Sequence, residues 1–210
     1  MRSKSSDYII GIDEAGRGPL AGPVAVGGVR IVSSSKYYVS RMLRGIKDSK
    51  QLSERQREEW FLFLTAHPAL VCAVVFVSPA MIDALNIRQA TLLGAARVYR
   101  KLTGASARDS VLPSRARVML DGGLFLPPGI GADQQTIIRG DEKIPLIAAA
   151  SIIAKVRRDR LMMRLHKKYP EYRFDLHKGY GTVLHRAMIA QFGRCEAHRQ
   201  SFRVDNPTTC

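Results

Sequence analysis

The sequence predicts a domain of the α/β class, with a mixed central β-sheet flanked by helices and a small helical part at the C-terminal end. Short apolar runs rich in β-branched residues occur early in the chain, helical patterns alternate with them, and the last third is almost entirely helical. With 210 residues, 46% of them hydrophobic, the chain is long enough to bury one core. We expect one domain over residues 1–210, with a core at about 8–169 and a C-terminal helical segment at about 170–210.

The predicted strands are apolar runs bounded by glycine, proline and polar residues. They lie at residues 8–12, 23–32, 70–77 and 115–121, and the run QTIIR at 135–139 is a candidate fifth strand. The strands precede or alternate with the helices, which is typical of a mixed sheet covered by helices.

The first predicted helix begins after Ser53, because Ser53 and Gln56 have the spacing of a capping box. A second helical pattern begins after Ser78, restarts at Asn86 and ends before Gly104. These local signals place two helices between the second and fourth predicted strands.

The longest helical pattern runs from Pro145 to about Tyr169, roughly 36 Å at 1.5 Å per residue. Its first half, LIAAASIIA, is apolar on almost every side, which predicts burial against the sheet. Its second half, KVRRDRLMMRLHKK, is amphipathic and basic and should reach solvent. After Pro170, KGYGT predicts a turn, and Thr182 can cap a last helix through Ala190.

The charge balance is strongly basic. Lys and Arg number 33 against 18 Asp and Glu, which gives a formal net charge of +15 and a pI near 10.2. A field of this sign attracts polyanions and predicts nucleic-acid binding, the alternative being a basic surface that only keeps the protein in solution.

The cysteines and the N-terminus exclude other classes. Three cysteines, far apart and without ligand spacing, indicate a reducing compartment and no structural zinc. The stretch MRSKSSDYII lacks the apolar segment of a signal peptide, and the apolar stretch that follows is interrupted by proline, glycine and arginine. We expect a cytoplasmic protein without a membrane span.

Two adjacent acids, Asp13 and Glu14, follow the first predicted strand and precede Gly16, Arg17 and Gly18. Because side chains alternate along a strand, both acids can serve one site only if the chain leaves strand geometry there, and the glycines allow this. When the stretch is taken alone, an acidic turn is the favoured interpretation.

Two further acids extend this hypothesis. Asp121, in LDGG, ends a predicted strand, which is where open α/β sheets present functional groups. Asp159 lies on the long helix, where a surface ion pair with Lys155 or Arg158 is the alternative. Clustered carboxylates would repel one another unless a cation held them, and oxygen-only ligands suit Mg²⁺ or Mn²⁺. Two such ions, about 3.5–4 Å apart, promote hydrolysis of a phosphodiester.

Five motifs then occur in order: GIDEAGRGPLAGPV, KDSKQLS, LDGG, IAAASIIAKVRRDR, and KGYGTVLHRAMIAQFG followed by HRQSF. In this order they resemble bacterial type 2 ribonuclease H, the ribonuclease HII family, over about residues 8–202. The resemblance implies a ribonuclease H-like fold. It also implies hydrolysis of the RNA strand of RNA/DNA hybrids and incision at single ribonucleotides in duplex DNA, leaving 3′-hydroxyl and 5′-phosphate ends.

The resemblance also assigns residues. It implies a two-metal site for Mg²⁺ or Mn²⁺ on the catalytic acids Asp13, Glu14, Asp121 and Asp159. It implies that the junction between ribonucleotide and deoxynucleotide is read by Gly16, Arg17, Gly18 and Tyr180. Without the family, a half-buried turn aromatic is the simpler interpretation of Tyr180. The basic residues expected to contact substrate phosphates are Lys47, Lys50, Lys155, Arg158 and Lys178.

Two positions depart from the family pattern. Gly123 stands where many relatives have asparagine, and Pro145 stands where serine is more familiar. Neither is an expected ligand, so we expect an effect on fine positioning and metal preference rather than on the reaction. The element Asp48–Lys50 either holds a loop near the site or forms a turn before a helix.

Two rival functions remain at this stage. Type 3 ribonuclease H shares the nuclease core but carries an additional N-terminal substrate-binding domain, and only seven residues precede Tyr8 here. A non-catalytic nucleic-acid-binding protein would bind without divalent metal, and its binding would survive Asp13→Asn. We expect a monomer that acts on RNA/DNA hybrids and ribonucleotide-containing DNA duplexes.

Overall fold

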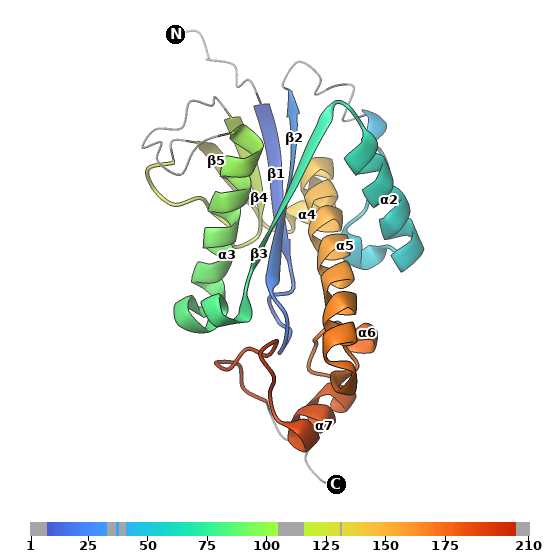
Figure 1. The fold of residues 1–210 in the computed structure, drawn as a ribbon. Coiled ribbons are helices and arrows are strands. Elements are labelled where there is room, and N and C mark those ends of the chain that lie inside the picture. Colours follow the sequence, from blue (N-terminus) through green and yellow to red (C-terminus); the bar gives the residue numbers. More distant parts are fainter. Residues whose placement is uncertain (1–7, 33–36, 38–40, 105–115, 131, 205–210) are drawn as a thin grey trace.

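A computed structural model of the chain describes residues 8–32, 37, 41–104, 116–130 and 132–204. Its centre is a five-stranded sheet with the order β3-β2-β1-β4-β5 (Figure 1). The strands are β1 (Tyr8–Ala15), β2 (Val24–Val32), β3 (Leu70–Val77), β4 (Ala116–Asp121) and β5 (Asp133–Ile137). The pairs β1–β2 and β2–β3 are antiparallel, whereas β1–β4 and β4–β5 are parallel. The mixed sheet is therefore confirmed, with β5 two residues earlier than predicted.

The helices follow the predicted order along the chain. They are α2 (Glu54–Ala66), α3 (Pro79–Thr103), α4 (Gly140–Lys143), α5 (Pro145–Lys168), α6 (Phe174–His177) and α7 (Val183–Phe192), with 3₁₀ turns η2 (Ser49–Gln51) and η3 (Pro170–Tyr172). The capping box of Ser53 and Gln56 is present at the start of α2. Asn86, at φ 66°, interrupts α3 and its side chain caps the restarted helix, as predicted. The four-residue helix α4 was not predicted.

Helices cover both faces of the sheet (Figure 1). On one face, Ile10, Ile12 and Val26 pack with apolar residues of α3. On the other face, the apolar half of α5 lies directly on glycines, because a Cβ at Gly27 would stand 2.5 Å from the carbonyl oxygen of Ala150. This close approach fixes α5 against β1 and β2.

The C-terminal segment has a small core of its own, in which Met162 of α5 packs with Tyr172, Phe174 and Ile189. This core lies beyond the end of the sheet, below β1 and β2 in Figure 1. Within the described residues, no helix combines the length and the apolar character that a membrane crossing requires.

Candidate active site

The acids of β1 lie where one of its two neighbouring strands stops. β1 pairs with β4 only as far as Ile12, but its pairing with β2 continues through Asp13, Glu14 and Ala15. The prediction that the chain leaves strand geometry at the two acids is therefore wrong. The physical reason is that β2 still holds the backbone, while the missing β4 partner opens space beside the acids.

Asp13 is almost fully buried, and its Oδ1 accepts a hydrogen bond from the Glu14 N–H at 2.7 Å. Burial raises the pKa of Asp13 well above its ordinary value, and the charges of Glu14 and Asp121 raise it further. Burial also raises the pKa of Glu14; the Arg17 charge opposes this, and Asp121 adds to it. Both acids therefore share the field of Asp121, as one site requires.

Asp121 ends β4, as predicted, and is held by backbone donors from the next turn. Its Oδ1 accepts from the N–H of Gly140 at 2.6 Å and from that of Asp141 at 3.4 Å. Burial raises its pKa, and the Asp141 charge adds to the increase. Gly140 is closely enclosed, because a Cβ there would stand 2.7 Å from Ile147 Cδ1 and 3.3 Å from Asp121 Oδ1.

Asp141 is the acid that the sequence analysis missed. Asp13, Asp121 and Asp141 each offer a carboxylate oxygen, and these oxygens all lie within 4.8 Å of one another. A signal was available, because Asp141 comes just after the end of the fifth predicted strand, much as Asp121 stands at the end of the fourth.

Asp159 does not join this cluster. Its carboxylate oxygens lie 2.8 and 2.7 Å from Lys155 Nζ, which is the ion pair weighed as the alternative. Ser151, whose hydroxyl acts on Asp13, stands eight residues earlier on α5, so Asp159 is roughly 12 Å further along the helix axis. By position, the acid that lies with Asp13 and Asp121 is Asp141 rather than Asp159.

The donor set fits a divalent cation. The three carboxylates repel one another and offer only oxygen ligands, which suits Mg²⁺ or Mn²⁺. Beside them, Glu14 Oε2 is buried without a hydrogen-bond partner within the described part of the chain. A buried unpaired carboxylate oxygen is costly, and a cation would satisfy it.

The element Asp48–Lys50 satisfies both of its interpretations. It forms the 3₁₀ turn η2 ahead of α2, and it also reaches the site. Ser49 Oγ lies 2.7 Å from Ser151 Oγ, and Lys50 Nζ lies 3.7 Å from Asp48 and 3.3 Å from Asp141. The lysine charge therefore offsets part of the repulsion within the acid cluster.

A buried arginine, Arg199, holds the backbone carbonyls of the glycine-arginine-glycine loop that follows β1. Arg199 donates to the carbonyl oxygens of Gly16 at 2.5 Å, Arg17 at 2.6 Å and Gly22 at 3.0 Å. Burial lowers the pKa of Arg199 to about 9, and the Arg158 charge contributes. Nothing in the sequence analysis singled out Arg199, because its carbonyl acceptors lie more than 170 positions away.

A second buried arginine, Arg158, does not make the phosphate contact expected of it. Arg158 is 1% exposed and donates to the carbonyl oxygens of Pro23 at 3.1 Å, Ala21 at 3.2 Å and Lys178 at 3.0 Å. The prediction that Arg158 contacts a phosphate is therefore wrong. Its side chain leaves α5 toward the loop after β1 rather than toward solvent.

The other expected phosphate contacts fall into two groups. Lys47 and Lys50 are exposed. Lys155 is engaged by Asp159, and Lys178 Nζ donates to the Asp175 carbonyl and lies near Met163 Sδ. Lys50 nevertheless contacts Asp48 and Asp141, so of these four lysines only Lys47 forms no ion pair or side-chain hydrogen bond within the described residues.

Tyr180 is 45% exposed and lies in a turn joined to the glycine loop. The N–H groups of Leu20 and Ala21 donate to the Gly179 carbonyl at 2.8 and 3.3 Å. The Arg158 guanidinium stands 5.9 Å from the Tyr180 ring centroid. The two expected junction-reading elements are therefore neighbours, and the Tyr180 side chain is partly open to solvent.

Comparison with known proteins points to one family. The family model described as Ribonuclease HII matches residues 10–205. Ribonuclease HII of Chlamydia muridarum is 46% identical over 194 residues, which cover 92% of this chain and 81% of that protein. The Xylella fastidiosa (strain M23) protein of the same name is 43% identical over 202 residues, with 96% and 80% covered.

Solved structures share the fold. RNase HII from Archaeoglobus fulgidus, solved in complex with PCNA, aligns with a TM-score of 0.72 at 28% identity and covers 96% of this chain and 98% of that one. Bst-RNase HIII, solved in complex with Mn²⁺, aligns with a TM-score of 0.70 and covers 94% and 68%. Its 19% identity is evidence for the fold alone.

Proposed function

Because the chain belongs to the ribonuclease HII family, we propose that it incises duplex DNA at single embedded ribonucleotides as well as cleaving the RNA of RNA/DNA hybrids. Cleavage of hybrid RNA by a divalent-metal-dependent endonuclease is the activity of this family. The finer activity, incision at a single ribonucleotide, rests on the closeness of the acids to the glycine loop. Only Ala15 separates Glu14 from Gly16 along the chain.

The observation that carries the proposal is the convergence of Asp13, Asp121 and Asp141 within 4.8 Å. These three carboxylates would hold one divalent ion, and Glu14, with its unpaired Oε2, would complete the shell or bind a second ion. Bound Mg²⁺ or Mn²⁺ would supply an activated water and charge stabilisation at the scissile phosphate. Lys50 would help hold Asp141 in place through the contact between their side chains.

The glycine loop has the features needed to recognise a 2′-hydroxyl. The carbonyls of Gly16 and Arg17 point inward to Arg199, and the peptide bonds are trans. In a trans peptide the N–H points opposite to the carbonyl, so the N–H groups of Arg17 and Gly18 would face away from the protein. Outward backbone donors can bind a ribose hydroxyl, and the exposed ring of Tyr180 beside them can stack on the next sugar.

The experiment is incubation with a duplex that contains one ribonucleotide, with and without Mg²⁺ or Mn²⁺, against an all-DNA duplex. We expect incision at the ribonucleotide only, and only with metal. Hybrid cleavage without any incision of the single-ribonucleotide duplex, in either metal, would refute the finer activity.

The ligand assignment has its own matched pair. Asp141→Asn should lower kcat by at least 100-fold, because it removes one of the three converging carboxylates. Asp159→Asn should stay within about threefold, because its partner is Lys155. The reverse order would restore Asp159 as the ligand. The monomeric state and the cytoplasmic location stay predictions.

A further inference from the structure

β3 is the terminal strand of the sheet, and within the described ranges no strand pairs with its outer edge. Its eight residues, LVCAVVFV, include no charge and no proline. Proteins commonly protect an edge strand by making it short or by adding charges or proline. This edge has none of these protections, and Val71 on it is 41% exposed.

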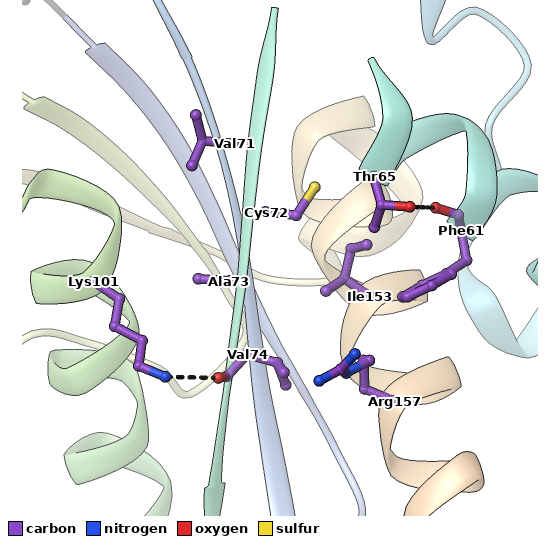
Figure 2. Close-up of a pocket in the computed structure, with 9 residues that line it drawn as sticks. All are labelled: Phe61, Thr65, Val71, Cys72, Ala73, Val74, Lys101, Ile153 and Arg157. Atoms are coloured by element: carbon purple, nitrogen blue, oxygen red, sulfur yellow. Dashed lines mark hydrogen bonds between the residues drawn. The ribbon is translucent and has the colours of Figure 1, made fainter. Parts of the chain in front are cut away.

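The direction of the backbone groups follows from two contacts. Lys101 Nζ donates to the Val74 carbonyl at 3.5 Å from the open side, as Figure 2 shows. The N–H of Leu70 donates to His67 rather than to β2. In an antiparallel pair, alternate residues direct both backbone groups to the same side. Cys72, Val74 and Phe76 therefore present N–H and C=O groups outward.

Hollows flank this edge on both sides. One, of about 450 Å³, lies between β3 and the helices α2 and α5 and is lined by Phe61, Ile153 and Arg157 (Figure 2). The other, of about 850 Å³, lies along α3 and is lined by Leu93 and Arg97. An added strand would find room for side chains on both faces of the sheet.

The cations around the edge lack acidic partners. Arg97, Arg100 and Lys101 of α3 and Arg157 of α5 form no ion pair in the described structure, and no acid lines either hollow. The Nε of Arg100 is buried without an acceptor among the described atoms. Four cations without an acidic partner, beside backbone groups that no strand pairs, are complementary to an acidic strand.

We propose that the outer edge of β3 binds an extended acidic segment of a partner protein, which adds a strand to the sheet through backbone hydrogen bonds. A second copy of this chain would bring the same unpaired cations together, which disfavours self-pairing. Nucleic acid would use the cations but not the apolar edge or its backbone groups. The edge is two strands from β1, roughly 10 Å across the sheet, so the surface is separate from the acid cluster.

The test uses two labelled decapeptides in which glutamate and valine alternate, one beginning with glutamate and the other with valine. Matched controls replace glutamate by lysine, or carry N-methyl groups on the alternate amides that would face β3. We expect the acidic peptides to bind at least tenfold more tightly than either control in fluorescence anisotropy. Hydrogen exchange should slow at the amides of Cys72, Val74 and Phe76 of the full chain.

A variant pair on α3 isolates the charge. Lys101→Glu should weaken peptide binding at least fivefold, whereas Arg88→Glu, an exposed change outside both hollows, should leave it within twofold. Hybrid cleavage should be unchanged in both. Absence of acidic-peptide binding, or equal binding of the N-methylated peptide, would overturn the proposal. Two other results would also overturn it. One is slowed hydrogen exchange at the same amides when only single-stranded DNA is added, and the other is slowed exchange that accompanies dimer formation in sedimentation.

Discussion

The two glycines of the glycine-arginine-glycine loop should respond in opposite ways to alanine. Gly16 has φ +87°, and a Cβ there would overlap Nε and Cδ of Arg158. Gly18 is not in the left-handed region, and a Cβ there would meet nothing within 4 Å. The sequence makes the two positions look equivalent, whereas the structure requires glycine only at the first.

The cost at Gly16 can be worked from these contacts. A left-handed non-glycine residue costs about 1–2 kcal/mol. Displacing Arg158 weakens charged hydrogen bonds to Ala21, Pro23 and Lys178, each worth about 1.5–3 kcal/mol, of which we count one as lost. The sum is about 2.5–5 kcal/mol. For a chain of this size, this lowers Tm by roughly 5–20 °C.

Gly18→Ala should change the free energy of unfolding by less than about 0.5 kcal/mol. If the Gly18 backbone approaches the ribose, its added methyl should nevertheless lower incision at a single ribonucleotide at least tenfold, mainly through KM. Thermal unfolding and steady-state incision on the same preparations measure both effects. A Gly16→Ala variant that melts within 2 °C of the parent would refute the structural reasoning, and a Gly18→Ala variant with parental KM would refute the close approach.

Three further predictions concern the acids and the basic residues. Burial and its acidic neighbours raise the pKa of Asp13, so the metal-free protein binds a proton there more readily than the unfolded chain does. Asp13 should therefore add stability to the metal-free protein as pH falls through its raised pKa toward the value of the unfolded chain. Asp13→Asn should raise the Tm of the metal-free protein while abolishing cleavage; a lower Tm in calorimetry would contradict this. Mg²⁺ at 100 times its Kd should stabilise the parent by about 2.7 kcal/mol and Asp141→Asn by much less, and equal shifts in thermal unfolding would remove Asp141 from the ligand set. Lys47→Ala should reduce the slope of log K against log salt by about 0.9 for hybrid binding; Arg158→Lys should lower Tm and leave that slope unchanged, and a reduced slope would show that Arg158 does reach a phosphate.

Local chemistry made much of the fold predictable. The Ser53 and Ser78 caps, the restart at Asn86 and the apolar half of α5 depend on residues within a few positions of one another. The strands of the central sheet were likewise visible as bounded apolar runs. The ends of β1 and β5 shifted most, by two or three residues, because strand ends depend on which neighbour still pairs.

The site was less predictable because its geometry depends on pairing between distant strands. β5 pairs with β4 so that Ile137 lies opposite Asp121, which carries the following turn, with Asp141, to the end of β4. Spacing along the chain does not contain this register. Asp159 was included because it lies on a helix expected to pack against the sheet and because the family resemblance assigned it to the catalytic acids, but Lys155, four residues earlier, pairs with its carboxylate.

If the glycine loop recognises a ribose, the buried arginines would connect that recognition to cleavage. Arg158 and Arg199 donate to backbone carbonyls, and neither forms an ion pair within the described residues. They fix the carbonyl side of Gly16 and Arg17, and the residue before Gly16 is the last of the strand that carries Asp13 and Glu14. A ribose hydroxyl bound at that loop would therefore lie at one set distance from the acid cluster. The same rigidity that makes Gly16 intolerant of a side chain would confine hydrolysis to one phosphate beside the recognised ribonucleotide.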